Sequence, residues 1–469
     1  MRGLCRQALL PTVLLGLGLS LLVPAGAGAK NAARALHPVE IAKGSQFPVA
    51  PSFARTADGR LHVAFEENTN WGDGGNGVGY STVSTSGHLL AEGLAVDWNT
   101  AGPENGIPGL AITPGGTLQA AFGGSPNSGP GPFVISSSAD GASWSGSSDA
   151  SSGFMEGSNP QVTLQYSHST PVLTAGCCGG IVVQQGFGNG SPSYLLTNNS
   201  DGVAGNVDTA VDAATGAVIA GWDSSAGSGG FWFQQIAPTE GVAQRAPVPS
   251  QNGPSYPFIV AGRDTGPGVF AAYPANYANT TQISLLRYGG GSISVGSVKG
   301  LHATQVGVAT GLDGRIWVMW DGQIDGKGVT AITRSNKAVT RFEPIQKYHY
   351  TWAGGITLSG DGRLGPLDLL IDGTPFGSST QGIYDARALP VLSVSVSAKS
   401  LGGGNFKLDV NVNDAGDPVS GATASAHGQS TTTNATGEAK FTVSGSPGKH
   451  LKVTITATNY WPLIKRTEL

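Results

Sequence analysis

One pattern recurs along most of this 469-residue chain and constrains its fold more than any other feature. The pattern is an apolar strand, a tight turn of the Asp-Gly type, a second strand ending in small or aromatic residues, a polar loop and a third strand. Its clearest copies are the segments 55–65 (RTADGRLHVAF) and 310–320 (TGLDGRIWVMW). Seven copies align, about fifty residues apart, with first strands beginning near Pro51, Pro108, Pro160, Asn206, Pro257, Thr304 and Trp352.

A period near fifty with three or four short strands is typical of a β-propeller, in which each repeat forms one four-stranded blade. We therefore predict an all-β fold with a seven-bladed β-propeller over residues 38–389. Residues 38–43 are expected to supply the outer strand of the last blade, which leaves no unpaired edge. The turns between first and second strands are placed at Asp58-Gly59, Gly115-Gly116, Ser167-His168, Thr215-Gly216, Asp264–Gly268, Asp313-Gly314 and Asp361-Gly362. Six or eight blades stay open, because the copy at Pro160 is degenerate and its turn lacks Gly.

The composition agrees with a folded β protein. The 73 Gly and 28 Pro residues argue against a helical fold, because both interrupt helices. Charged residues make up only 12 %, and the 39 % of hydrophobic residues supplies ample core. The net charge is −4, and no basic cluster is longer than Lys465-Arg466. A nucleic-acid partner or an anionic membrane surface is therefore not expected.

Residues 1–29 have the order of a secretory signal peptide. Arg2 and Arg6 precede an apolar run over residues 8–25, and small residues follow up to Ala29, the expected cleavage site, with Ala27 as the alternative. A retained membrane anchor is the other interpretation, but the run is short and contains two Pro residues. We expect a secreted, extracellular bacterial protein, a monomer with no membrane span in its mature chain, and leave attachment to the cell surface open.

The segment Ser138-Ala-Asp140-Gly141-Ala-Ser-Trp144 resembles the Asp-box of sialidase-like (BNR-repeat) β-propellers. The resemblance implies a tight turn, made by Asp and Gly, between the two outer strands of a blade, with Trp packed into the blade. In that family the box is structural and faces away from the site. Arg60, Arg315 and Arg363 fall in the predicted turns, at the end opposite the expected site, and the Arg-Ile-Pro motif of sialidases is absent. The resemblance therefore implies the fold rather than sialidase activity.

Residues 391–469 change in character and read as alternating strands rich in Thr, Val and Lys. The segments 416–423 (GDPVSGAT), 431–441 (TTTNATGEAKF) and 456–458 (TAT) resemble bacterial Ig-like and carboxypeptidase-regulatory-like modules. The resemblance implies a small Ig-like β-sandwich that acts as a spacer or adhesive unit. Asp409, Asp414 and Asp417 are expected to be solvated strand and turn residues rather than a metal site.

A binding site is expected at one face of the propeller. In propellers, the loops from second to third strands and those leading into each first strand open around the central channel, and the Asp-Gly turns lie at the other end. Acids, amides and aromatics in these loops suit a polar, sugar-like ligand, although many of them fit equally a solvated loop. The candidate ligand-binding residues are Glu67, Asn105, Asn159, Tyr256, His302, Tyr350 and Trp352. Asp58, Asp313 and Asp361, in the turns, are expected to be functionally silent.

Four acidic residues end second strands and are candidates for catalysis: Glu66, Asp223, Asp321 and Asp372. A glycoside hydrolase needs two carboxylates, one of them held protonated by an apolar pocket. Asp223 and Asp321 directly follow a Trp, which raises a carboxyl pKa by desolvation. Equivalent positions also arise from repeat duplication without any function. The eight histidines are dispersed, so neither a metal nor a cofactor is predicted.

Cys177 and Cys178 are adjacent in the segment AGCCGG, where the third copy has its loop from second to third strand. In an oxidising compartment such a pair can close a disulfide, and two free buried thiols are the alternative. Two function hypotheses remain. The first is a secreted recognition protein for an extracellular glycan or protein, with the C-terminal module as a spacer or adhesive unit. The second is a sialidase-like extracellular glycoside hydrolase or lyase. Sialidases require three arginines around a carboxylate, and their absence from the expected site favours the first hypothesis.

Overall fold

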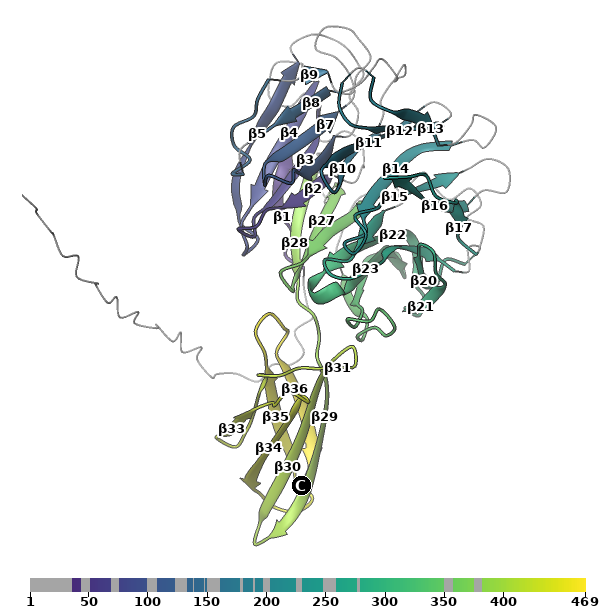
Figure 1. Cartoon of the computed structure of the whole chain (residues 1–469). Coiled ribbons are helices and arrows are strands. Elements are labelled where there is room, and N and C mark those ends of the chain that lie inside the picture. The colour runs from purple at the N-terminus through teal and green to yellow at the C-terminus, as the bar shows by residue number, and fades with distance from the viewer. Residues whose placement is uncertain are drawn as a thin grey trace, which may run out of the picture. The chain divides into compact units, whose positions relative to one another are not determined.

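Short strands make up nearly all the regular structure of the computed structural model (Figure 1). The structure describes residues 36–43, 51–68, 76–98, 108–122, 133–137, 139–146, 148–149, 161–177, 180–188, 190–196, 203–224, 230–247, 259–275, 279–349, 357–374 and 382–469. Within these ranges the one helical turn is η2 (Leu312–Gly314). The predicted all-β class is therefore confirmed. The predicted signal peptide, residues 1–29, lies outside the described residues.

Successive stretches of chain form four-stranded antiparallel sheets, in which the strands follow one another in sequence order. The first two sheets contain β2 (Ser52–Arg55), β3 (Leu61–Asn68), β4 (Asn76–Val83) and β5 (Leu89–Trp98), then β6 (Gly109–Ile112), β7 (Leu118–Phe122), β8 (Phe133–Ser136) and β9 (Ser148–Asp149). The next three contain β10 (Gln161–Ser167), β11 (Thr170–Cys177), β12 (Gly180–Gln185) and β13 (Ser193–Leu195); β14 (Val203–Val211), β15 (Val218–Ser224), β16 (Gly230–Ala237) and β17 (Gln244–Arg245); and β18 (Val260–Gly262), β19 (Val269–Pro274), β20 (Gln282–Arg287) and β21 (Ser292–Ser297).

Two further four-stranded units share one eight-stranded sheet. The first unit is β22 (His302–Gly311), β23 (Ile316–Ile324), β24 (Lys327–Arg334) and β25 (Gln346–His349), and the second is β26 (Thr357–Gly362), β27 (Leu367–Gly373), β28 (Gly382–Ala388) and β1 (Val39–Lys43). A short parallel contact between β22 and β26 joins the two units. β1 pairs antiparallel with β28, and Figure 1 shows this purple N-terminal strand beside the green β28. The prediction that residues 38–43 supply an outer strand to the last unit is confirmed.

Local chemistry places most of the tight turns where the sequence predicts them. Gly59, in the turn between β2 and β3, has a φ of +86°, which a side chain rarely tolerates. In the β10–β11 turn, which lacks Gly, His168 takes the left-handed conformation, with a φ of 57°. The predicted turn at Asp361-Gly362 is wrong, because both residues still belong to β26. The chain turns after them, with Gly365 at a φ of +102°.

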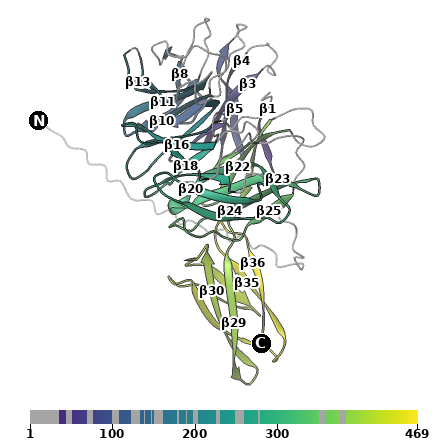
Figure 2. The same cartoon turned by 90° about the vertical axis from the view of Figure 1, so that its right-hand side faces the viewer.

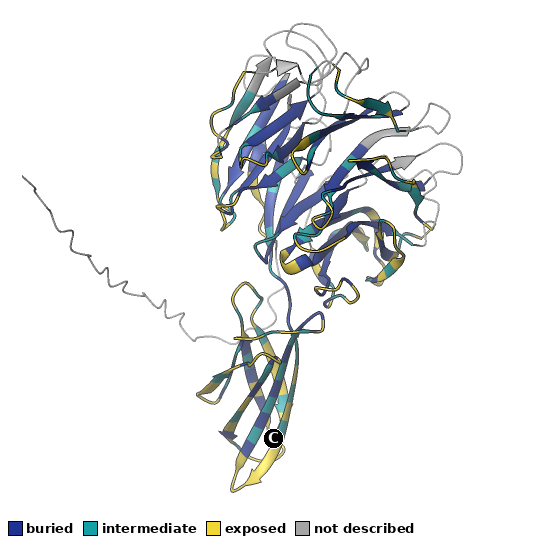
Figure 3. Cartoon of the chain, in the orientation of Figure 1, coloured by how far each residue is buried: buried dark blue, intermediate teal, exposed yellow. Residues whose placement is uncertain are grey.

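Apolar side chains fill the spaces between neighbouring sheets, and the buried strands are dark blue in Figure 3. The first strands of consecutive sheets contact one another, from β2 and β6 through to β22 and β26. The last unit also packs on the first sheet, because Ile41, Leu370 and Ile383 share a core cluster with Leu61 and Val63. The succession of sheets therefore returns to its start.

Residues 391–469 form two further four-stranded sheets around their own core (Figure 2). One contains β29 (Ser393–Gly402), β30 (Asn405–Asp414), β31 (Asp417–Pro418) and β34 (Glu438–Ser444), and the other β32 (Thr423–Ala426), β33 (Gln429–Thr432), β35 (His450–Thr456) and β36 (Leu463–Glu468). Alternation of buried and less buried residues along β30 and β35 follows from the two-residue period of a strand with one face in a core.

The expectation that Asp414 is solvated is wrong. Its side chain is 1 % exposed and forms ion pairs with Arg334 (2.5 Å) and Arg315 (3.4 Å). The Tyr460 hydroxyl also donates a hydrogen bond to it (2.7 Å). Asp417 pairs with Arg315 at 2.7 Å and keeps a side chain that is 25 % exposed. Because both arginines belong to the β22–β25 unit, charged contacts attach residues 391–469 to that unit.

Candidate functional site

The first strands of the sheets surround a cavity of about 500 Å³. Residues of β2, β6, β10, β14, β18, β22 and β26, or directly beside these strands, line it. Each sheet before residue 391 contributes its first strand, so the cavity lies at the centre of the sheet succession. Its volume falls within the ~300–1,000 Å³ of typical small-molecule sites. Apolar side chains such as Phe53, Leu110 and Ile259 provide part of the wall.

Asp208, on β14, is one of three acidic residues that line this cavity, with Asp264 and Asp361. The backbone N–H groups of Thr209 and Val260 donate to its two carboxylate oxygens, both at 2.8 Å. Burial raises the pKa of Asp208 to about 7, although these two hydrogen bonds act in the opposite direction. At neutral pH the cavity therefore contains a carboxyl group that can either donate or accept a hydrogen bond.

Other polar side chains in the wall connect neighbouring sheets. Gln165 donates from Nε2 to the carbonyl of Thr209 (3.0 Å), and the Tyr166 hydroxyl bonds to Gln119. Ser52 accepts the backbone N–H of Leu110 (2.7 Å). These hydrogen bonds hold the polar side chains of Gln165, Tyr166 and Ser52 next to the cavity.

Two wall residues keep a polar atom without a partner. The hydroxyl oxygens of Thr209 and Ser359 are buried and make no hydrogen bond, and the two residues are only 4 % and 2 % exposed. A buried hydroxyl without a partner costs about 1–3 kcal/mol.

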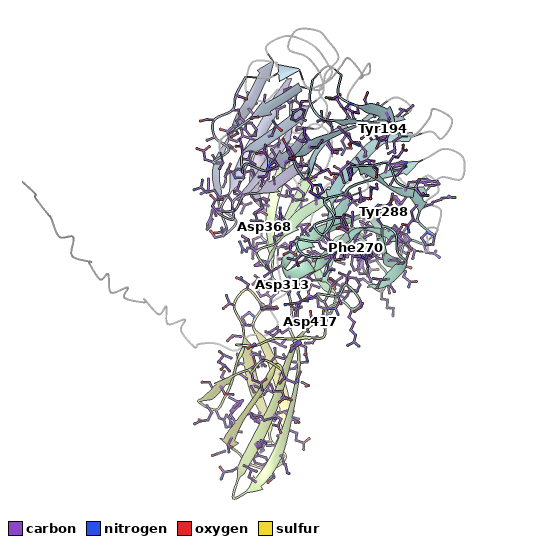
Figure 4. All side chains as sticks on the ribbon, in the orientation of Figure 1. Tyr194, Phe270, Tyr288, Asp313, Asp368 and Asp417 are labelled. Atoms are coloured by element: carbon purple, nitrogen blue, oxygen red, sulfur yellow. The ribbon has the colours of Figure 1, made fainter. Side chains whose placement is uncertain are left out.

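Paired charges lie at the end of the cavity nearest the turns. Arg55 binds Asp361 through Nε and Asp368 through Nη2, both at 2.5 Å, and all three side chains are at most 3 % exposed. Burial by itself raises the pKa of Asp361, but attraction to Arg363 and Arg55 outweighs it and lowers that pKa. Asp368, labelled in Figure 4, lies among these strands. These ion pairs connect the first sheet to the last unit.

The same charges explain why Asp361 stays in a strand. Its backbone pairs with Asp368 across β26 and β27, and its carboxylate holds Arg55 of the first sheet. The next residue, Gly362, packs against Trp317, and a Cβ there would lie 2.2 Å from the indole nitrogen. Tertiary contacts therefore extend β26 beyond the predicted turn.

Two of the candidate catalytic acids have described side chains. Asp321 lies on β23, 9 % exposed, and burial raises its pKa to about 7. Asp372 lies on β27 and is fully buried. Asp321 is on the face of its sheet that packs against β26–β28, whereas Asp372 is on the far face of β27, beside Leu370. The sheet β26–β28 separates them, so the structure does not bring them together as a pair.

Most other candidates fall where side chains are not described. Glu66 and Glu67 belong to β3 and Asp223 to β15, with only their backbone described. Outside the described residues lie Asn105, Asn159, Tyr256, Tyr350 and Trp352. His302 is exposed at the start of β22, with Nδ1 2.6 Å from the carbonyl oxygen of Asn279. Cys177 ends β11 opposite Gly180, but Cys178 is not described, so the disulfide stays a prediction.

The segment that resembles an Asp-box forms a hydrogen-bonded turn between β8 and β9. Asp140 accepts the N–H of Ala142 (3.1 Å), and the indole N–H of Trp144 donates to the carbonyl of Gly141 (2.8 Å). Gly141 has a φ of +70°, and a Cβ there would lie 2.6 Å from His62 of the neighbouring sheet. These contacts give the segment a packing role between the first two sheets. Ser138 lies outside the described residues.

Asp208, Thr209 and Gln165 are site residues that sequence reasoning missed. The search concentrated on strand ends and loops, whereas these three lie within first strands. The available signal was the pair Asp208-Thr209, two adjacent polar residues within residues 207–211 (VDTAV), which are otherwise Val and Ala.

Neither a metal centre nor a bilayer-crossing helix emerges from the described residues. In that part of the chain, no three His, Cys, Asp or Glu side chains are grouped so as to hold a metal ion. The same residues include no helix with the length and hydropathy that crossing a bilayer requires.

Comparison with known proteins gives distant structural likenesses. No protein-family model and no curated protein sequence matches the chain. The lectin BP39L of Burkholderia pseudomallei shares 11% identity, over 71% of this chain and 98% of its own, with a TM-score of 0.48. The polysaccharide lyase Uly1 shares 11% identity over 73% and 90% of the two chains, with a TM-score of 0.41.

A chain from a study of two prolyl endopeptidases shares 10% identity over 79% of this chain, with a TM-score of 0.41. This protein spans 55%, about half, of that chain. At such identities and TM-scores, these likenesses assign neither a family nor an activity.

Proposed function

We propose that this chain is a secreted recognition protein that binds a polar, sugar-like ligand of an extracellular glycan in its central cavity. The observation that carries the proposal is the cavity wall, which combines apolar side chains with the polar residues Asp208, Gln165, Thr209 and Ser359. Sugars present both apolar C–H surfaces and hydroxyl groups, so such a mixed wall matches them.

The proposal includes the architecture around the cavity. We infer that the sheets from β2 to β28, with β1, are the seven blades of a sialidase-like β-propeller over residues 38–389, and that Asp140 and Trp144 belong to an Asp-box. Residues 391–469 are an Ig-like module. The return of the last unit onto the first sheet supports a closed arrangement.

The ligand is expected to approach from the end where the first strands begin. At the other end, Arg55, Asp361 and Asp368 neutralise one another. On the same side, Arg315 and the backbone N–H of Lys337 are bound by Asp417 of the C-terminal module. These turn residues are occupied by contacts within the chain, which supports the prediction that the turns carry no binding function.

A sialidase-like glycoside hydrolase or lyase is the second candidate. It is favoured by the raised pKa of Asp321, because a carboxyl that stays partly protonated at neutral pH suits a general acid. Its partner carboxylate is not Asp372, which lies on the other side of a sheet. Glu66 and Asp223 remain as candidate partners.

A glycan array and a set of chromogenic glycosides, applied to the full secreted chain, test both candidates. Recognition predicts that specific glycans are retained without turnover, and that Asp208→Ala weakens binding at least tenfold. Asp313→Ala, in an exposed turn ion pair with Lys337, is the matched control and should bind normally. The proposal fails if no glycan is retained or if Asp208→Ala binds like the control. Turnover that is lost in Asp321→Asn would establish the hydrolase.

A further inference from the structure

The strands β33, β32, β35 and β36 form one sheet of the C-terminal module, residues 391–469 (β35 and β36 are labelled in Figure 2). Side chains alternate between the two faces of a strand, so the buried Leu451, Val453 and Ile455 of β35 point into the core and the residues between them point outward. Directly paired residues of neighbouring antiparallel strands project from the same face. The outward side chains therefore form rows that cross the sheet.

One of these rows carries hydroxyl groups. Ser425 pairs with Ser430 on one side and with Thr454 on the other, and Thr454 pairs with Ile464. None of these four residues is buried. The Ser425 hydroxyl donates to the backbone carbonyl of Thr454 (3.5 Å) and keeps its oxygen as an acceptor. Because Ser and Thr hydroxyls both donate and accept hydrogen bonds, the row suits a ligand that carries hydroxyl groups.

The next row, two residues along β35, is basic. Lys452 pairs directly with Arg466 of β36, and both side chains are exposed. Like charges directly opposite each other in a sheet are destabilising. Within the part of the chain that the structure describes, neither side chain forms an ion pair. An anion bound between them would remove the repulsion.

Most acidic residues of the module lie elsewhere. Glu468, at the end of β36, is the only acid among the residues of these four strands. The other acids of the module, Asp409, Asp414, Asp417 and Glu438, form ion pairs with Lys407, Arg334, Arg315 and Lys440, respectively. Two of these pairs attach the module to the β22–β25 unit, and the other two lie on the opposite sheet. The positive charge of β35 and β36 is therefore largely uncompensated.

We propose that the hydroxyl row and the basic row together form a docking surface for an acidic polysaccharide. Carboxylate groups of the polymer bind Lys452 and Arg466, since ammonium and guanidinium groups make strong charge-assisted hydrogen bonds to carboxylates. Its hydroxyl groups bind the neighbouring Ser and Thr side chains. The inference goes beyond the proposed function and concerns residues 391–469 alone, so it does not depend on ligand binding in the central cavity.

Two features of the same strands favour a polysaccharide over other polyanions. The four strands, all of whose residues are described, contain no Phe, Tyr or Trp, so nucleic-acid bases find no ring on which to stack. Ile464, 47 % exposed, is the one large apolar side chain in the two rows. A single such side chain is too little apolar surface for binding to a lipid bilayer.

The test compares wild type with two double variants that remove the same number of charges. Lys452→Gln with Arg466→Gln removes the basic row. Lys407→Gln with Lys440→Gln is the matched control, because these two cations lie beside acidic partners on the other sheet. Binding of the full chain to polygalacturonate is measured by isothermal titration calorimetry, with dextran as the uncharged probe. Phosphatidylglycerol vesicles and single-stranded DNA serve as the other polyanions.

We expect wild type and the control variant to bind polygalacturonate but not dextran, and the basic-row variant to lose roughly tenfold in affinity, because two charge-assisted contacts are lost. Equal losses in both double variants would show attraction by net charge alone and would overturn the proposal. Tighter binding to vesicles or DNA than to polygalacturonate, or no binding by wild type, would overturn it too. Lys452→Arg keeps the charge and should bind like wild type, and weak binding by this variant would contradict the proposal even if the double variant fails to fold.

Discussion

Replacing Arg55 by Ala should destabilise the protein through two buried carboxylates. In wild type, the guanidinium of Arg55 binds Asp361 and Asp368 at 2.5 Å each and donates to the carbonyl of Gly59 at 2.8 Å. The substitution removes this cation from a site where both acids are 1 % exposed. The consequence is uncompensated negative charge between the last unit and the first sheet.

The size of the effect follows from the partners that remain. Breaking a buried ion pair on one side costs about 3–5 kcal/mol. Asp361 keeps Arg363 at 2.6 Å, but Asp368 keeps only Arg387 at 3.7 Å. We therefore expect the free energy of unfolding to fall by about 3 kcal/mol, toward the lower end of that range.

Urea unfolding of the full chain, followed by tryptophan fluorescence, measures the change. Arg60→Ala is the control, because Arg60 pairs with Asp58 while both side chains are about half exposed, and such a pair contributes about 0–1 kcal/mol. Arg55→Met combined with Asp361→Asn and Asp368→Asn should recover most of the loss, since no fully buried charge is then left unpaired. Arg363 and Arg387 lose their carboxylate partners, but their side chains are 38 % and 27 % exposed and stay in contact with water. A loss in Arg55→Ala no larger than in Arg60→Ala would refute the argument.

Three further predictions concern other parts of the fold. Deleting residues 38–43 removes the β1–β28 pairing and should lower stability by several kcal/mol, on the order of a third of a typical domain's total; an unchanged melting temperature would contradict it. Asp208→Asn should flatten the pH dependence of the unfolding free energy between about pH 4 and 7. The carboxyl has a pKa of about 7 when folded and near 3.8 when unfolded, so in wild type the unfolding free energy falls as pH rises through that window. Urea midpoints with the same pH dependence in variant and wild type would exclude the effect. Asp414→Ala leaves Arg334 buried without its carboxylate and should lower stability by about 3–5 kcal/mol. We expect faster proteolysis between residues 389 and 393 in the variant, and cleavage rates equal to those of wild type would contradict this.

The sequence predicts the strand succession well because its signals are local. Gly59, Gly116 and Gly216 all take positive φ in turns placed from sequence, and the first strands begin within a few residues of their predicted starts. Asp361 and Asp414 were misjudged because their conformation and burial depend on arginines far away in the chain, Arg55 and Arg334.

The candidate site was harder to predict for the same reason. The surroundings of a carboxyl inside a first strand, such as Asp208, depend on the next sheet, where the N–H of Val260 donates to it. Asp321 and Asp372, chosen at equivalent strand ends, are both buried, at 9 % and 0 % exposed, and each lies on the face of its unit that packs against the next unit. Repeat position predicts these equivalent places, but how far a neighbouring unit buries each acid depends on tertiary packing.

The pairing of β1 with β28 has a consequence for how the chain folds. Val39 meets Asp385, so β1 finds its partner only after the chain between them, with most of the sheets, has been made. Contacts of such long sequence separation slow folding, since the loop entropy is lost before the contact forms. Once formed, the pairing leaves no terminal sheet from which unravelling can start, unlike an open repeat array. Slow acquisition of the native state and slow loss of it are thus expected to arise from the same five-residue strand.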